Sequence, residues 1–116
     1  MPELPEVVVT LRGILPYILG KKISRVTVRN GNLRWPVPKD LSVILNNRKL
    51  ESGRQRAKYM LFRFPHGHMI IHLRMSGNLR VLPDDALPEK HDHVDIFFDN
   101  KVLLRYSDPR RFGSIL

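Results

Sequence analysis

Apolar residues recur at every third or fourth position over roughly the first twenty residues, which is the period of an amphipathic helix. The apolar set is Leu4, Val7, Val8, Leu11, Ile14, Leu15, Ile18 and Leu19. Pro5 suits the first turn of such a helix, and Glu3 and Glu6 suit the positive end of its dipole. We expect Pro16 to break or kink the helix and Gly20 to end it.

From Lys21 onward the pattern changes to short alternating or β-branched stretches separated by turn signals. The expected strands cover residues 23–28, 48–56, 57–64, 68–74, 79–82, 93–98 and 101–107. A short helix is expected at residues 40–45, and His66-Gly67 and Asp99-Asn100 look like hairpin tips. The pattern therefore predicts a mainly β fold of the α+β class. We expect a two-sheet β-sandwich or flattened barrel with the N-terminal helix at one side.

The charge and the cysteine content limit which functions the chain can have. The 116 residues are enough for one domain. Residues 1–82 hold fifteen basic and four acidic side chains, whereas residues 83–116 hold five basic and seven acidic side chains. This excess indicates a polyanion partner, most simply nucleic acid, although a solvated basic surface is the alternative. The absence of Cys excludes disulfides and a Cys-based zinc site within the chain. No run of membrane-spanning length or signal-peptide layout occurs, so we expect a cytoplasmic protein without a membrane partner.

The first residues carry a candidate nucleophile. Met before Pro is readily removed, which would leave Pro2 with a free secondary amine. An α-amino group has a pKa of about 7.7–8.0, so part of it is uncharged at neutral pH. Glu3 stands beside it as a candidate acid or base, the arrangement that covalent catalysis needs. The alternative is an ordinary helix start.

Basic residues alternate in the expected second and third strands. Arg54, Arg56 and Lys58 would share one strand face, where three cations repel each other unless a polyanion lies across them. Lys58 precedes an apolar run, so we expect it where the strand enters the core, as a partly desolvated phosphate anchor. A solvated edge strand is the alternative.

Two further stretches combine polar and apolar side chains in an unusual way. His72 is expected on a strand face opposite to the apolar residues, and the following loop would expose Met75, although Met is usually a core residue. The segment 108–113 begins with Asp-Pro and carries Arg110, Arg111 and Phe112, a loop suited to inserting into a stacked duplex. A turn with its Phe in the core is the alternative. The His pairs at 66/68 and 91/93 lack a third ligand, so no metal site is expected.

Six motifs in order resemble one family. They are Pro2-Glu3-Leu4-Pro5-Glu6-Val7, residues 30–36 (NGNLRWP), residues 56–59 (RAKY), residues 72–77 (HLRMSG), residues 90–95 (KHDHVD) and residues 108–113 (DPRRFG). Over all 116 residues the chain resembles the N-terminal catalytic domain of bacterial formamidopyrimidine-DNA glycosylases. Leu4 stands where the sister endonuclease VIII branch has Gly, which favours the purine-lesion branch.

The resemblance implies a bifunctional glycosylase/AP lyase of base-excision repair. Such an enzyme flips an oxidised purine, 8-oxoguanine or formamidopyrimidine, out of double-stranded DNA. It implies that Pro2 attacks the sugar C1′ and forms a Schiff base, that Glu3 transfers protons, and that β,δ-elimination cuts the strand. Lys58 matches a catalytic, phosphate-contacting lysine. The DNA-contacting set it implies is His72, Met75, His91, Arg110, Arg111 and Phe112, of which Met75, Arg110 and Phe112 fill the vacated stack.

The sequence departs from the family in two places. Val8-Val9 stands where the family has Glu-Thr, which removes a polar group behind the active site. The family also continues beyond the position of Leu116 into a helix-two-turn-helix domain and a four-Cys zinc finger, so we expect no cofactor within residues 1–116 and zinc only in that further part. The family is monomeric, whereas an isolated domain exposes a surface suited to self-association.

Three alternatives stay open at this point. The chain is a non-catalytic DNA-binding β domain, an inactive fragment of the enzyme, or an enzyme that uses an N-terminal Pro as a general base, as tautomerases do. The last leaves the basic charge and the Arg-Arg-Phe segment unexplained.

Overall fold

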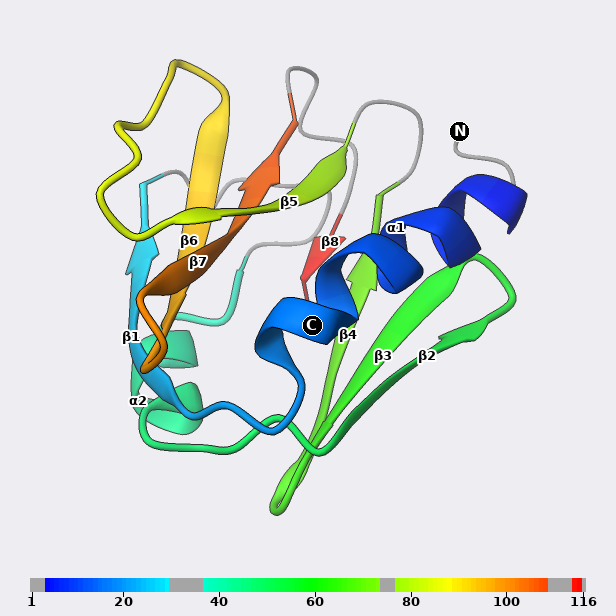
Figure 1. Ribbon diagram of the computed structural model, residues 1–116, viewed down its shortest axis with the longest axis horizontal. Helices are drawn as coiled ribbons and strands as arrows, with labels where there is room; N and C mark the ends of the chain where they lie inside the picture. Colours follow the sequence, from blue (N-terminus) through cyan, green and yellow to red (C-terminus); the bar gives the residue numbers. More distant parts are fainter. Residues whose placement is uncertain (1–3, 30–36, 74–76, 109–113, 116) are drawn as a thin grey trace.

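In the part of the chain that the structure describes, the strands form two four-stranded antiparallel sheets flanked by two helices (Figure 1). The computed structural model describes residues 4–29, 37–73, 77–108 and 114–115. Its elements are α1 (Leu4–Ile18), β1 (Ile23–Val28), α2 (Leu41–Leu45), β2 (Ser52–Arg56), β3 (Tyr59–Phe64), β4 (Gly67–His72), β5 (Asn78–Pro83), β6 (Asp92–Phe98), β7 (Val102–Ser107) and β8 (Ser114–Ile115). The sheet orders are β1-β6-β7-β5 and β2-β3-β4-β8. The predicted two-sheet fold with an N-terminal and a second short helix is therefore confirmed.

Alternating burial along the strands creates the space between the sheets. In β3, Met60, Phe62 and Phe64 are buried, whereas Tyr59 and Arg63 are exposed on the other face. Successive side chains of a strand point to opposite faces, so this alternation directs every second residue into the sandwich. The same pattern explains why the sequence alone predicted strands here.

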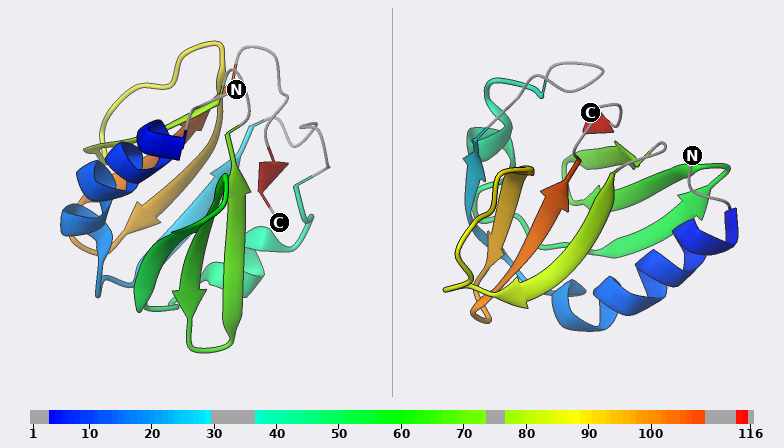
Figure 2. Two further views of the ribbon diagram at one scale, coloured as in Figure 1. Left: turned by 90° about the vertical axis from the view of Figure 1, so that its right-hand side faces the viewer. Right: turned by 90° about the horizontal axis from the view of Figure 1, so that it is seen from above.

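α1 closes one open side of the sandwich. It packs against β2 and β5, which belong to different sheets, and Figure 2 shows it running along the gap between them. Val7, Leu11, Ile14 and Ile18 form its buried face. These positions follow the helical period read from the sequence, so the prediction of an amphipathic helix is confirmed.

Pro16 does not break this helix, although a break or a kink was expected there. α1 continues through Pro16 to Ile18. A proline removes one hydrogen bond from the helix, and this loss lies close to the end, where helices fray in any case. Gly20 then adopts φ +77° just beyond the helix, the left-handed conformation that ends helices at glycine.

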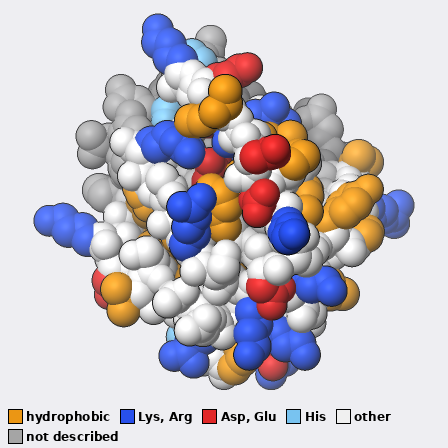
Figure 3. Space-filling view, turned by 60° about the vertical axis from the view of Figure 1, so that its left-hand side comes forward, with side chains coloured by type: hydrophobic (Ala, Val, Ile, Leu, Met, Phe, Trp, Pro, Cys, Tyr) orange, Lys and Arg blue, Asp and Glu red, His pale blue; other side chains and the backbone are white. Residues whose placement is uncertain are grey.

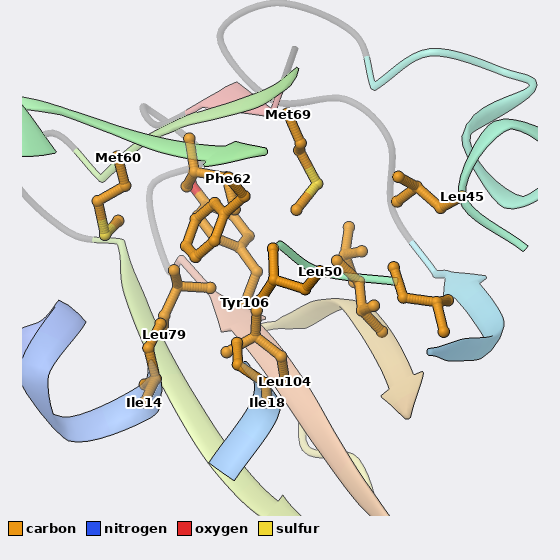
Figure 4. Packing of buried hydrophobic residues seen from close by; sticks show 14 of the residues in the cluster. Ile14, Ile18, Leu45, Leu50, Met60, Phe62, Met69, Leu79, Leu104 and Tyr106 are labelled. Carbon is orange, nitrogen blue, oxygen red and sulfur yellow. The ribbon is translucent and has the colours of Figure 1, made fainter. Parts of the chain in front are cut away.

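The core joins α1 to both sheets. Figure 4 shows Ile14 and Ile18 of α1 lying with Phe62 of β3 and with Leu104 and Tyr106 of β7. All five side chains are buried and belong to one hydrophobic cluster. Burying a side chain of this size contributes about 1.5–3 kcal/mol, so the cluster fixes the two sheets against each other.

The predicted strand boundaries were partly wrong. The strand expected at 48–56 begins only at Ser52, and before it Lys49 makes an isolated bridge to Lys22 and Leu50 is buried in the core. The strand β8 was not predicted. It pairs Ile115 with Ile71, and a strand of two residues carries no periodic signal.

Candidate nucleic-acid interface

The register of one sheet brings three strand ends together. Ser107, at the end of β7, lies opposite Asp92 at the start of β6 and opposite Asn78 at the start of β5. His91 therefore precedes β6, and Asp108 follows β7, at this same end of the sheet. The backbone N–H of Asp108 donates a 3.0 Å hydrogen bond to the His91 carbonyl oxygen, which joins the two segments directly.

The second sheet ends at the same place. Arg56 pairs with Tyr59 at the close of the β2–β3 hairpin, and Ser114 of β8 pairs with His72 at the end of β4. A hydrogen bond from Gly77 N–H to the Leu73 carbonyl, 2.9 Å long, links the end of β4 to the start of β5. In Figure 1 the ends of β4 and β7 and the start of β6 lie toward the top, and the β2–β3 turn lies at the right. Here these strand ends are together called the upper end of the sandwich.

Lys58 occupies the β2–β3 turn rather than a strand. Ala57 and Lys58 are the two residues that connect Arg56 to Tyr59, and the Lys58 residue is exposed. Our expectation that Lys58 lies where a strand enters the core was wrong. Ala57 has φ +51°, a left-handed conformation that tight two-residue hairpins require and that favours Gly or Asn. The turn lacks these residues, which is why the sequence pattern did not reveal it.

His72 lies on the strand face opposite to Met69 and Ile71, as expected, but it is buried there. The residue is only 4% exposed, and its ring meets the edge of the Tyr59 ring with centroids 4.7 Å apart and planes at 87°. Tyr59 directly follows Lys58, so this contact fixes the turn relative to the end of β4. The expected role of His72 in phosphate contact stays a prediction.

Two hydrogen bonds fix Asp108, the first residue (the root) of the segment 108–113. The Tyr106 hydroxyl donates to Asp108 Oδ2 at 2.7 Å, and His93 Nε2–H donates to the Asp108 carbonyl oxygen at 2.7 Å. Burial, together with the hydrogen bond to Asp108, raises the pKa of Tyr106 well above its ordinary value. Tyr106 therefore stays neutral and keeps donating throughout the physiological range.

A buried ion cluster lies beneath His91, and the sequence analysis missed it. Arg105 donates from Nε and Nη2 to the two carboxylate oxygens of Asp95 at 2.9 and 3.0 Å. Arg29 approaches the same carboxylate at 2.7 Å. The signal was present, because Asp95 stands between Val94 and Ile96, and Arg105 stands between Leu104 and Tyr106. Burial alone would raise the pKa of Asp95, but the hydrogen bonds and charges of Arg105 and Arg29 outweigh it, so the pKa is lowered.

Asp92 extends this cluster to the start of β6. It accepts a 2.7 Å hydrogen bond from the Glu89 N–H, another from the Ser107 hydroxyl, and lies 3.3 Å from Arg80 Nη2. Burial opposes ionisation, yet the hydrogen bonds from Ser107 and Glu89 and the charges of Arg105 and Arg80 together lower the pKa of Asp92.

The cluster also fastens the connection between β5 and β6. Arg105 donates to the carbonyl oxygens of Leu87 at 3.1 Å and Ala86 at 2.9 Å. The segment 84–91 is thereby tied to the sheet from below, and its last residue, His91, is exposed at the upper end. Asp92, Asp95 and Arg105 thus support His91 without being exposed themselves.

Charge is not uniform over the surface. Figure 3 views the side of the molecule that carries β1, β6 and α2, where acidic side chains are interspersed with Lys and Arg. Several arginines elsewhere are neutralised: Arg29 and Arg105 pair with Asp95, and Arg80 pairs with Asp92. The basic excess therefore falls on the remaining cations, which include Arg54 and Arg56 of β2.

The remaining predicted site residues lie outside the described part of the chain. They are Pro2, Glu3, Met75, Arg110, Arg111 and Phe112. Within residues 4–29, 37–73, 77–108 and 114–115, no cluster of three His, Asp or Glu side chains is arranged to hold a metal ion. Within the same residues, no helix is long and apolar enough to cross a membrane.

Comparison with known proteins identifies the family. Residues 1–115 match the family described as the formamidopyrimidine-DNA glycosylase N-terminal domain. The chain belongs to the formamidopyrimidine-DNA glycosylase family. It is 53% identical over 116 residues to the formamidopyrimidine-DNA glycosylase of Saccharophagus degradans, and 54% identical over 119 aligned residues to that of Burkholderia thailandensis. Each comparison covers 100% of this chain but 43% of the relative, so the chain spans less than half the length of these glycosylases.

Solved structures of the same family share the fold. The chain superposes with a TM-score of 0.88 on Lactococcus lactis Fpg in a complex with DNA that contains an abasic site, at 32% identity. It superposes with a TM-score of 0.89 on L. lactis Fpg bound to DNA that contains FAPY-dG, also at 32% identity. These superpositions cover 98% and 97% of this chain and 42% and 43% of the solved chains.

Proposed function

We propose that this chain is the DNA-repair domain of a formamidopyrimidine-DNA glycosylase that binds damaged duplex DNA at the upper end of its sandwich. Its relatives carry that enzyme name, and solved members hold DNA with an abasic site or a FAPY lesion. The observation that supports the proposal most is the strand register. Within one sheet it brings His91 beside Asp108, and within the other it brings the turn of Lys58 beside the end of β4, which the hydrogen bond from Gly77 to Leu73 joins to the first sheet.

In the proposed reaction, removal of Met1 frees the secondary amine of Pro2. Its nitrogen forms a bond to the sugar C1′ as the bond from C1′ to the damaged base breaks, and the base leaves with that electron pair and a proton. The C1′–O4′ bond of the sugar then breaks, O4′ takes up a proton, and the bond from the Pro2 nitrogen to C1′ becomes an iminium. The iminium acidifies the C2′ hydrogens, so loss of a C2′ proton expels the 3′ phosphate by β-elimination, and loss of the C4′ proton then expels the 5′ phosphate by δ-elimination. Glu3, the adjacent carboxyl, is the proposed proton-transfer group.

The upper end would hold the nucleic acid for this chemistry. Lys58 stands on a turn where its ammonium can meet a phosphate, which contributes affinity without reading sequence. Met75, Arg110 and Phe112 are the proposed residues that fill the stack after the damaged nucleotide is flipped. Unstacking a base costs a few kcal/mol, which apolar and cationic insertions offset.

Strand nicking and borohydride trapping test the proposal. The chain, with Met1 removal verified by mass spectrometry, is mixed with a duplex that contains 8-oxoguanine or an abasic site. Pro2→Gly should reduce the yield of the borohydride-stable adduct, because a primary amine on a freely rotating residue replaces the fixed secondary amine, and Glu3→Gln should suppress base release. Wild-type levels of adduct and nicking in both variants would refute the assigned roles.

A DNA-binding domain without catalysis is the second candidate, and it is favoured by one observation. The chain spans 43% of the length of its relatives, so any groups that the remaining part of those enzymes supplies are not within residues 1–116. This candidate predicts binding whose affinity falls steeply with salt, with log K decreasing by about 0.9 per phosphate contact for each unit of log salt, and no nicking.

A further inference from the structure

The outward face of β2, β3 and β4 carries a groove that the proposed reaction does not use. Its volume is about 480 Å³, and its lining includes Leu61, Ile70, Tyr59, Arg54 and Arg56. The face is opposite to the core, because Gly53, which precedes Arg54, lies against Leu15 of α1 on the inner side. Side chains alternate along a strand, so Arg54 and Arg56 point outward.

The floor of the groove is an apolar row. Arg54 is paired with Leu61, and Leu61 is paired with Ile70, so these three residues lie side by side across three strands. Leu61 and Ile70 are half-buried, and Tyr59 beside them is 41% exposed. The groove thus offers an apolar strip that the described part of the chain does not cover.

The rim of the groove is cationic and lacks acidic neighbours. Among the described residues, no carboxylate pairs with Arg54 or Arg56, and no Asp or Glu lines the groove. His68 adds a further basic group on β4. Arg54 and Arg56 thereby differ from Arg29 and Arg105, which pair with Asp95, and they are available to a partner.

We infer that this groove binds an extended acidic segment of a partner protein, with Asp or Glu side chains on the arginines and a Leu, Ile or Phe side chain on the Leu61–Ile70 strip. An apolar strip gives nothing to a phosphate backbone, and an aliphatic floor is a poor stacking platform for bases, so nucleic acid fits less well. Peptide binding in this groove does not depend on whether the chain cleaves DNA.

The test measures the binding of labelled peptides to the intact chain by fluorescence anisotropy. The probe is a short peptide that alternates Asp with Leu. Arg54→Glu should weaken its binding roughly tenfold or more, because charge-assisted hydrogen bonds are lost and like charges meet. The matched control is Arg12→Glu, which makes the same charge change at an exposed residue of α1 outside the groove and should alter binding by less than about twofold.

Two further probes separate the components of the site. A peptide that alternates Asp with Ser should bind roughly tenfold more weakly than the Asp–Leu peptide, and Leu61→Ser should remove that difference. Equal losses in the Arg54 and Arg12 variants, equal affinity of the two peptides, or no binding of the Asp–Leu peptide would each overturn the inference. So would a single-stranded or duplex oligonucleotide that displaces the peptide and loses its own binding in Arg54→Glu.

Discussion

Replacing Arg105 with Met tests whether the buried ion cluster holds the β5–β6 connection in place. The guanidinium donates to both oxygens of Asp95 and to the carbonyls of Ala86 and Leu87, and the side chains of Arg105 and Asp95 are 3% and 0% exposed. Removing one partner of a buried pair costs about 3–5 kcal/mol. Arg29 remains on Asp95, so we expect the lower value, about 3 kcal/mol.

Urea unfolding at neutral pH measures this loss, and amide hydrogen exchange locates it. A loss of this size should lower Tm by roughly 10–15 °C in a domain of this size. Exchange should accelerate in residues 84–91 before it does so in the core strands. The matched control is Arg80→Met, which removes the same kind of group from a pair whose arginine side chain is 49% exposed. That variant should lose less than about 1 kcal/mol.

The stability that the ion cluster contributes depends on pH. The pKa values of Asp92 and Asp95 are lowered in the folded chain. Their contribution to stability is therefore present above the unfolded pKa of about 3.9 and is lost as pH falls through the lower folded values. Arg105→Met weakens the lowering, so its deficit relative to wild type should be largest at neutral pH and shrink below about pH 4. A deficit under about 0.5 kcal/mol, or one independent of pH, would refute this reasoning.

Three other predictions follow from local geometry. Ala57→Gly should stabilise the chain by about 0.5 kcal/mol in urea unfolding, because it relieves φ +51° at a non-glycine residue, and a loss of stability would show that the turn is not strained. Gly77→Ala should lower the free energy of unfolding by about 1–3 kcal/mol, because the added Cβ would lie 2.7 Å from the Leu73 carbonyl oxygen. Gly13→Ala is the matched control: it has open space around it in α1 and should raise the free energy of unfolding by up to about 1 kcal/mol. Equal effects of the two substitutions would contradict the geometry. Lys58→Ala should make the slope of log K against log salt for duplex binding shallower by the contribution of about one phosphate contact, as measured in a salt titration. An unchanged slope would show that Lys58 does not contact the DNA.

Hydrophobic periodicity was sufficient to predict the fold because burial in this protein follows the period of each element. The period of α1 places Val7, Leu11, Ile14 and Ile18 on one face, and that face is the buried one. What periodicity could not predict is the turn at Ala57, since neither Ala nor Lys signals a left-handed conformation. Such a turn is dictated by the pairing of the two strands beside it.

The motifs of the candidate site could be predicted from the sequence, but the buried ion pair that supports them could not. Motifs at residues 56–59, 72–77, 90–95 and 108–113 indicated the interface, and the strand register brings the described portions of these motifs to one end of the molecule. Asp95 and Arg105 could not be recognised as partners, because their pairing depends on the register between β6 and β7. Sequence spacing within one strand carries no information about the strand opposite.

Chemical-shift mapping with a duplex that contains an abasic site tests the central claim most directly. The claim is that the upper end of the sandwich is the surface that meets DNA. On titration, the amides of Lys58, His72, His91 and Asp108 should shift together, and those of the opposite hairpins at residues 64–67 and 99–101 should not. Shifts confined to those two hairpins, or to the groove of Leu61 and Ile70, would contradict the account.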